Sequence, residues 1–217
     1  MNNKIKITGA IFDFDGTLFD SMHVWRGVRV NFFKKLGLEF TKEDEEAFKG
    51  LFLRESFTLA IKRFGLDYTY EELLDMLFAY IKSRYLEETE PKNDIIEFLE
   101  KLKSMGVKMG IATATGESAL EAVLEKYDML HYFSAIYSTY TVGASKTEPK
   151  VYDVVLGELG TDKNTTWVFE DAVYAAKTAK ENGYNVVGIY DKSEPAQDEL
   201  KSIVDIYIHN YNELKIE

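Results

Sequence analysis

Hydrophobic and polar positions divide the chain into two regions with different patterns. Residues 5–14 form a short apolar run, which predicts a buried first strand. From residue 22 to 86, apolar positions recur at helical spacing, and we find no convincing strand pattern there. From residue 93 onward, short apolar runs alternate with helical segments, which is typical of a parallel sheet covered on both faces.

Each region predicts a definite set of elements. The first predicts helices over residues 22–36, 42–49, 54–64 and 70–86. The second predicts helices over 94–105, 117–127, 148–159 and 172–181, and strands over 107–112, 135–138, 166–169, 186–189 and 206–208. The expected fold class is therefore α/β, a Rossmann-like parallel sheet core with an inserted all-helical domain. We expect residues 1–16 and 89–217 to form the core and residues 17–88 the insertion.

Composition narrows the classes of function. The 217 residues include 46% hydrophobic residues, enough for a proper core, and carry a net charge of -11. The absence of a Lys/Arg stripe argues against a nucleic-acid partner, and no apolar run is long enough for a signal peptide or a membrane span. The lack of Cys excludes thiol chemistry. We expect a soluble, cytoplasmic protein that is a monomer.

Side chains that could act in catalysis or bind a ligand follow the predicted strands at one edge of the sheet. Asp13 and Asp15 end the first strand, Thr113 ends the second, Lys146 follows the third, and Glu170-Asp171 end the fourth. Ligand sites in open parallel sheets form outside the carboxyl ends of the strands, so we expect these side chains to meet.

This set of side chains indicates phosphate chemistry. Clustered carboxylates repel one another unless a cation intervenes, and oxygen-only ligands select a hard cation, most simply Mg²⁺. A Mg²⁺ site beside a Lys and a Thr hydroxyl suits a phosphate group. One carboxylate could attack phosphorus, and the second could protonate the leaving oxygen and later deprotonate water.

These motifs resemble those of the haloacid dehalogenase superfamily of phosphatases and phosphomutases, over nearly the whole chain. Asp13-Phe14-Asp15-Gly16-Thr17, Ile111-Ala112-Thr113, Lys146 and Phe169-Glu170-Asp171 are similar to its first to fourth motifs. One departure is Thr147, where family members often have Pro.

The resemblance implies roles for the matching residues. Asp13 would be the nucleophile and a Mg²⁺ ligand, and Asp15 the general acid/base with its backbone carbonyl as a further ligand. Thr113 and Lys146 would hold the phosphoryl group, while Glu170 and Asp171 would complete the metal site. The helical insertion would be a cap that closes over the site and excludes water.

The substrate is less well determined than the chemistry. We expect a small phosphate monoester, a sugar or nucleotide phosphate, with Arg54, Ser21 and Trp25 as candidate substrate-binding residues. One alternative is a mutase resembling β-phosphoglucomutase, which carries a His at the position of Trp25; His23 lies about 200° around the helix from there. Another is a non-catalytic phosphometabolite-binding protein, which would be expected to have lost one of the acids.

Overall fold

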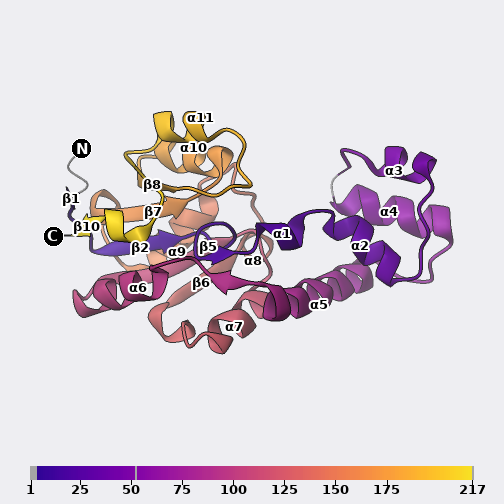
Figure 1. Ribbon diagram of the computed structural model, residues 1–217, viewed down its shortest axis with the longest axis horizontal. Helices are drawn as coiled ribbons and strands as arrows, with labels where there is room; N and C mark the ends of the chain where they lie inside the picture. Colours follow the sequence, from indigo (N-terminus) through magenta and orange to yellow (C-terminus); the bar gives the residue numbers. More distant parts are fainter. Residues whose placement is uncertain (1–3, 52, 217) are drawn as a thin grey trace.

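A six-stranded parallel sheet forms the centre of the computed structural model, which describes residues 4–51 and 53–216 (Figure 1). The strand order is β6-β5-β2-β7-β8-β9, with β2 and β7 in the middle. The strands are β2 (Gly9–Phe12), β5 (Lys108–Thr113), β6 (Ala135–Ser138), β7 (Thr166–Glu170), β8 (Asn185–Ile189) and β9 (Ile206–Ile208). In register, Phe12 pairs with Ile111 on one side and with Phe169 on the other, so these strands end at one edge.

Successive strand residues point to opposite sides of the sheet, and apolar residues occur on both sides. Helices therefore cover both faces. Phe12 belongs to the core on the face of α6 (Ile95–Ser104) and α7 (Glu117–Lys126), and it stacks on Phe169 at 4.4 Å between ring centroids. Ile11 belongs to the core on the opposite face, under α9 (Lys150–Leu159), α10 (Val173–Glu181) and α11 (Gln197–Ile203). A four-residue helix, α8 (Thr139–Val142), follows β6.

An all-helical insertion lies between β2 and the rest of the sheet. It comprises α1 (Met22–Trp25), α2 (Val28–Lys35), α3 (Lys42–Phe48), α4 (Leu53–Phe64) and α5 (Tyr70–Glu88), and it extends away from the sheet on the side of α8 (Figure 1). Its centre is aromatic: Phe33 contacts Phe32, Phe48 and Phe57. No helix in the described part of the chain has the length and apolar character needed to cross a membrane.

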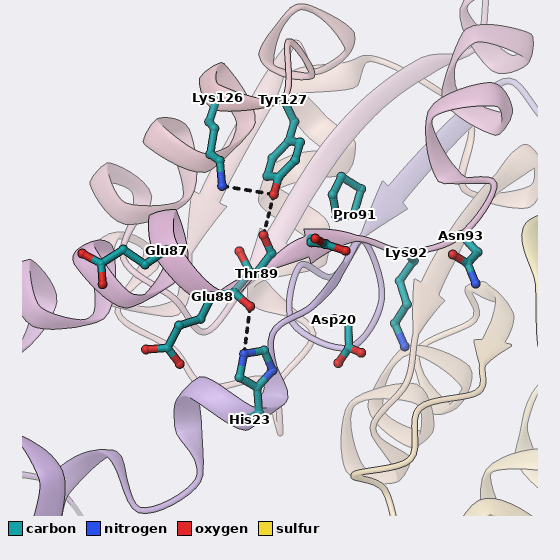
Figure 2. A pocket seen from close by; sticks show the side chains of 11 residues that line it. Asp20, His23, Glu87, Glu88, Thr89, Pro91, Lys92, Asn93, Lys126 and Tyr127 are labelled. Carbon is teal, nitrogen blue, oxygen red and sulfur yellow. Dashed lines mark hydrogen bonds between the residues drawn. The ribbon is translucent and has the colours of Figure 1, made fainter.

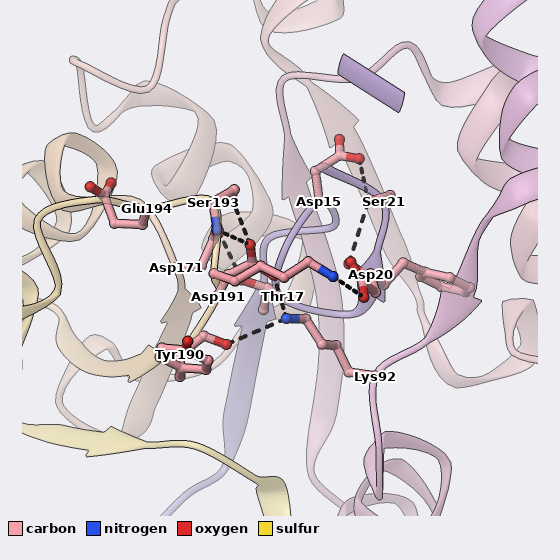
Figure 3. Close-up of polar contacts among 12 residues, drawn as sticks. Asp15, Thr17, Asp20, Ser21, Lys92, Asp171, Tyr190, Asp191, Ser193 and Glu194 are labelled. Carbon is pink, nitrogen blue, oxygen red and sulfur yellow. Dashed lines mark hydrogen bonds and ion pairs between the residues drawn. The ribbon is translucent and has the colours of Figure 1, made fainter. Parts of the chain in front are cut away.

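The insertion leaves and rejoins the sheet domain through two strands that pair with each other. β3 (Phe19–Asp20) and β4 (Glu90–Pro91) are antiparallel partners, with Asp20 opposite Glu90. Ion pairs tie this junction to the loop after β8: Lys92, which follows β4, pairs with Asp191 at 2.5 Å (Figure 3). Asp20 of β3 pairs with Lys192 at 3.1 Å. A separate two-stranded ladder joins β1 (Lys4–Ile5) and β10 (Lys215–Ile216) near the chain ends.

The fold class predicted from the sequence is confirmed, with local corrections. The helix predicted over residues 22–36 is wrong as a single element: it divides at Gly27, whose φ of 65° a right-handed helix does not permit. The strand predicted over 5–14 divides into β1 and β2. The pattern also missed α8, β3 and β4, which have four residues or fewer, and α11, in which Leu200 is the buried residue; such elements bury too few side chains to show a period.

Candidate active site

Three buried carboxylates meet at the carboxyl edge of the sheet. Asp13 directly follows β2, Glu170 is the last residue of β7, and Asp171 comes next. One oxygen from each lies within 4.8 Å of the others, and the three residues are between 1% and 7% exposed. Neighbouring parallel strands end here together, so the topology places these acids side by side.

Lys146 enters this group from the loop before α9. Its ammonium group contacts Asp13 Oδ1 and donates to Glu170 Oε1 at 2.7 Å, and its side chain is only 3% exposed. Tyr152 on α9 donates to the same Glu170 oxygen at 2.7 Å. Because buried charges need partners, Lys146 is the counter-ion that allows Asp13 and Glu170 to lie inside the protein.

The pKa values of two carboxyl groups at the site are raised. Burial raises the pKa of Asp13 to about 8; the positive charge of Lys146 opposes this shift, and the negative charges of Glu170 and Asp15 add to it. Burial, followed by the negative charges of Asp13 and Glu170, raises the pKa of Asp171 well above its usual value. One lysine thus compensates these carboxyls only in part, which is the condition under which a further cation binds favourably.

Asp15 lies in a different setting, held by three hydroxyl groups. Ser21 donates to Oδ1 at 2.6 Å (Figure 3), Tyr85 donates to Oδ1 at 2.5 Å, and Thr115 donates to Oδ2 at 2.6 Å. Ser21 is fully buried, so its hydroxyl serves Asp15 rather than facing open space. The position of the Asp15 carboxylate is therefore fixed by three separate segments of the chain.

The turn that follows Asp15 brings the backbone close to Asp171. Gly16 has a φ of +82°, and a Cβ built on it would meet Asp171 Oδ2 at 2.2 Å. Thr17 donates to Asp171 Oδ1 at 3.3 Å, and the carbonyl of Thr17 accepts from Tyr211 at 3.0 Å. The turn is thereby fastened to both β7 and the C-terminal segment.

A cavity of about 290 Å³ opens over this cluster. Its acidic and basic lining residues are Asp13, Asp15, Lys146, Glu170 and Asp171, and its walls are Met22, Trp25, Ala114, Tyr140, Ala172 and Tyr174. The charged groups thus gather on one part of the surface, and apolar and aromatic groups form the remainder. Such a cavity can hold a small molecule that has one anionic end.

The other predicted site residues are placed differently. Thr113 ends β5 and is fully buried, with its hydroxyl accepting from the backbone N–H of Thr115 at 3.0 Å; its neighbour Ala114 reaches the cavity. Trp25 lines the cavity. Arg54 does not line it: Arg54 is exposed on α4, with its guanidinium 4.1 Å from the ring centroid of Tyr70.

Three tyrosine and threonine side chains at the site were not singled out from the sequence. Tyr85 and Thr115 hold Asp15, and Tyr152 holds Glu170. Thr115 follows β5 at the carboxyl edge of the sheet, and this position in the sequence could have indicated a site residue. Tyr85 and Tyr152 lie inside helices and follow the same apolar period as core residues, so the pattern gives no sign of their hydroxyl contacts.

His23 belongs to a second cavity, of about 320 Å³, beside β3 and β4 (Figure 2). Its Nε2 lies 3.0 Å from the carbonyl oxygen of Glu88. Trp25 rather than His23 lines the cavity over the carboxylates, in agreement with the predicted orientation of the first helix.

Comparison with protein families identifies the family to which the chain belongs. The model for haloacid dehalogenase-like hydrolases matches residues 10–189. The chain belongs to this family. The resemblance inferred from the motifs is thereby confirmed, and so is the expectation of an enzyme. The matched span contains the carboxylates, Lys146 and the whole helical insertion.

Two relatives of this hydrolase are named as phosphatases, one for hexitols and one for fructose 1-phosphate. The chain is 29% identical to hexitol phosphatase B of Escherichia coli over 194 residues, covering 83% of each protein. It is 26% identical to fructose-1-phosphate phosphatase YqaB of the same organism over 190 residues, covering 85% of this chain and 97% of the relative. Among solved structures, CbbY of Rhodobacter sphaeroides in complex with phosphate has the same fold, with a TM-score of 0.79, 18% identity and 97% coverage of each chain.

Proposed function

We propose that this hydrolase is a Mg²⁺-dependent phosphatase that hydrolyses a small phosphate monoester through an aspartyl-phosphate on Asp13. The observation that carries the proposal is the cluster of Asp13, Glu170 and Asp171 around Lys146 in a cavity, with Asp15 on its border. A nucleophile, a second acid and a cation-binding group are what phosphoryl transfer to a carboxylate requires.

The donor set fits a magnesium ion. Asp13, Glu170 and Asp171 each offer a carboxylate oxygen within 4.8 Å of the others, and neither sulfur nor imidazole belongs to the cluster. The raised pKa values of Asp13 and Asp171 indicate carboxyls that repel one another and would be stabilised in the charged form by a cation. When bound, Mg²⁺ would neutralise phosphate oxygens and leave the substrate open to attack by a carboxylate.

Different residues of the chain then carry out the separate steps of the reaction. Asp13 attacks phosphorus and forms the new O–P bond, while Asp15 gives its proton to the leaving alkoxide as the ester O–P bond breaks. Asp15, now a carboxylate, takes a proton from the water that attacks the phosphorus of the aspartyl-phosphate. The O–P bond to Asp13 breaks, inorganic phosphate leaves, and the Asp13 carboxylate is restored. Lys146, which lines the cavity, holds the phosphoryl group and also compensates charge on Asp13 and Glu170. Thr113 is buried beside the cavity, and its hydroxyl accepts from the Thr115 N–H, so its own hydrogen would be the group that it offers to the phosphoryl oxygens.

We propose that residues 17–88 act as a cap over this site. Both crossings to the sheet domain run through the paired strands β3 and β4, so the insertion can pivot there as one body. Trp25 and Met22 of α1 already line the cavity. Closure would exclude water while the substrate reacts with Asp13, and Arg54 would approach the substrate only in that state.

The lining favours a substrate whose organic part is uncharged. Of the described residues that line the cavity, only Lys146 is positively charged, and it already contacts Asp13 and Glu170. A second phosphate or a carboxylate would therefore lack a counter-ion there. Trp25, Tyr140 and Tyr174 offer flat faces and polar edges, which suits a sugar or polyol phosphate, the class named for the relatives hexitol phosphatase B and YqaB.

Phosphate release from a panel of monoesters, with Mg²⁺ and with chelator, tests the proposal. We expect Mg²⁺-dependent release, abolished by Asp13→Asn, and kcat/KM at least about tenfold higher for fructose 1-phosphate than for fructose 1,6-bisphosphate, a difference of about 1.4 kcal/mol. Substantial hydrolysis by Asp13→Asn would refute the nucleophile. Conversion of β-glucose 1-phosphate to glucose 6-phosphate without phosphate release would assign the chain to the mutases instead.

A further inference from the structure

A chain of hydrogen bonds runs from the wall of the cavity to the Asp15 carboxylate. The indole Nε1 of Trp25 donates to the hydroxyl of Tyr85 at 2.8 Å, and that hydroxyl donates to Asp15 Oδ1. Trp25 borders the space in which a substrate would lie. Both Trp25 and Tyr85 belong to the helical insertion, whereas Asp15 follows the central strand of the sheet.

The direction of these hydrogen bonds is set by the donors available. An indole N–H can only donate, so the Tyr85 hydroxyl must accept from Trp25 and use its single hydrogen elsewhere. Thr115 lies 3.2 Å from the Tyr85 hydroxyl, but it gives its own hydrogen to Asp15 Oδ2. Of the two oxygens that could accept the Tyr85 hydrogen, Asp15 Oδ1 at 2.5 Å is closer than Thr115 Oγ1 at 3.2 Å, and it receives the hydrogen.

Tyr85 is built into the structure as a fixed donor. Its side chain is fully buried, and its ring packs against Phe14 at 5.7 Å between centroids. Burial, followed by the charge of Asp15, raises the pKa of Tyr85 well above its usual value, so the hydroxyl keeps its hydrogen. A buried phenol with two defined partners has little freedom to turn away from Asp15.

We propose that Tyr85 is a positioning residue for the general acid, and that Trp25 acts through it, so that the helical insertion sets where the Asp15 proton is delivered. The proposal rests on the role of Asp15 proposed above. It adds that two side chains of the insertion, neither of which touches the phosphoryl group, control proton transfer to the leaving group.

The leaving group of the substrate provides a readout that separates positioning from folding. An alkyl phosphate must receive a proton as its O–P bond breaks, whereas p-nitrophenyl phosphate releases a weakly basic phenolate that leaves without one. The parameter kcat/KM reports the steps up to departure of the leaving group. A displaced Asp15 therefore slows the alkyl substrate selectively, whereas a damaged fold slows both.

The variant to examine is Tyr85→Phe, with fructose 1-phosphate and p-nitrophenyl phosphate as substrates. We expect kcat/KM for the sugar phosphate to fall at least about tenfold, because general acid catalysis contributes roughly 10²–10⁴-fold and depends on geometry. For p-nitrophenyl phosphate we expect a fall of less than about threefold. An equal fall for both substrates, or no fall, would overturn the proposal.

Tyr184→Phe is the matched control. Tyr184 is also a buried tyrosine that donates to an aspartate, with its hydroxyl 2.6 Å from Asp153 Oδ1, and it does not line the cavity. We expect kcat/KM to be unchanged for both substrates in this variant. If Tyr85→Phe fails to fold, Trp25→Phe decides the question, because it removes the indole donor and keeps an aromatic wall: a selective loss on the sugar phosphate with KM unchanged supports the proposal, whereas a rise in KM alone, an equal loss on both substrates or no loss overturns it.

Asp15→Asn distinguishes failure of this proposal from failure of the proposed function. If Asp15 is the general acid, this variant loses kcat/KM for fructose 1-phosphate far more than kcat/KM for p-nitrophenyl phosphate, whatever Tyr85→Phe does. If Asp15→Asn hydrolyses both substrates as the parent does, the role of Asp15 itself is wrong.

Discussion

Gly16 lies so close to Asp171 that a single methyl group between them would meet Asp171 Oδ2 at 2.2 Å. The same glycine has a φ of +82°, a conformation that residues with a side chain rarely adopt. Gly16 is thus required twice, once for the turn that follows Asp15 and once for the approach of Asp171 to that turn.

Gly16→Ala should therefore disable the site as well as strain the backbone. Gly37→Ala is the matched control, since Gly37 has a φ of +81° and nothing lies within 4 Å of its added Cβ. We expect Gly37→Ala to cost about 1–2 kcal/mol in free energy of unfolding with activity retained. Gly16→Ala should cost more and lower kcat/KM at least about a hundredfold, because displacement of a reacting group by about an ångström has that effect. Equal unfolding free energies and retained activity in both variants would contradict this.

Tyr152→Phe should weaken the apparent affinity for Mg²⁺. Tyr152 donates to the Glu170 oxygen that also receives Lys146, and this hydrogen bond orients the carboxylate. Loss of a partner that orients a metal ligand costs roughly 10–100-fold in metal affinity. The measurement is the Mg²⁺ concentration for half-maximal activity, with Tyr184→Phe as control. An unchanged concentration would mean that Tyr152 does not orient a metal ligand.

Lys146→Met should destabilise the protein most in the absence of metal. Removal of Lys146 leaves Asp13 and Glu170 buried without their counter-ion, and breaking a buried ion pair costs about 3–5 kcal/mol. We expect Mg²⁺ to restore part of this loss, because it would neutralise the same carboxylates. Denaturant unfolding in chelator and in Mg²⁺ measures the difference.

Lys92→Met provides the comparison for that experiment. Lys92 also forms an ion pair, partly buried, with Asp191, but it lies outside the carboxylate cluster. Its loss should be similar in chelator and in Mg²⁺. If Mg²⁺ restores both variants equally, the rescue is unrelated to Asp13 and Glu170.

Asp44 should make the stability of the helical insertion depend on pH. Hydrogen bonds from the side chain and backbone of Thr41, together with Arg63, hold the pKa of the Asp44 carboxyl below its usual value. A carboxyl with a lowered pKa in the folded state stabilises that state above its unfolded pKa, about 3.9, and this stability is lost as pH falls through the folded pKa. The stability difference between the parent and Asp44→Asn should be full at neutral pH and shrink below about pH 4.

Glu72→Gln calibrates that measurement. Glu72 forms the equivalent capping box with Thr69, and its pKa is likewise lowered by the Thr69 hydrogen bonds, but without an arginine among the causes. The denaturant midpoint should therefore change less than in Asp44→Asn. A difference for Asp44→Asn that stays constant from neutral to acid pH would contradict the assignment.

The sequence was sufficient to predict the fold class and the residues that gather at the sheet edge. Asp13, Lys146, Glu170 and Asp171 each follow a strand or lie in a loop at the carboxyl side, and parallel topology alone then brings them together. A local signal was enough here, because the sheet converts position along a strand into position in space.

Contacts that depend on packing between distant segments could not be predicted in this way. Tyr85 meets Asp15 across a separation of 70 residues, and Thr115 does so across 100. These hydrogen bonds depend on how α5 and the loop after β5 pack against the sheet, and hydrophobic periodicity does not specify that packing. The break of the first helix at Gly27 had a local signal, since a glycine inside a helical pattern marks a weak point.

The pairing of β3 with β4 has a consequence for the architecture as a whole. The strand that leaves the sheet domain and the strand that returns to it are hydrogen-bonded neighbours, about 5 Å apart, so the break they create in the chain is only as wide as a hairpin turn. Everything between Asp20 and Glu90 can therefore grow, shrink or be exchanged without altering the order of the six parallel strands. The order of the strands is thus independent of the insertion, whereas the setting of Asp15 is not, because Ser21 and Tyr85 from that segment donate to its carboxylate.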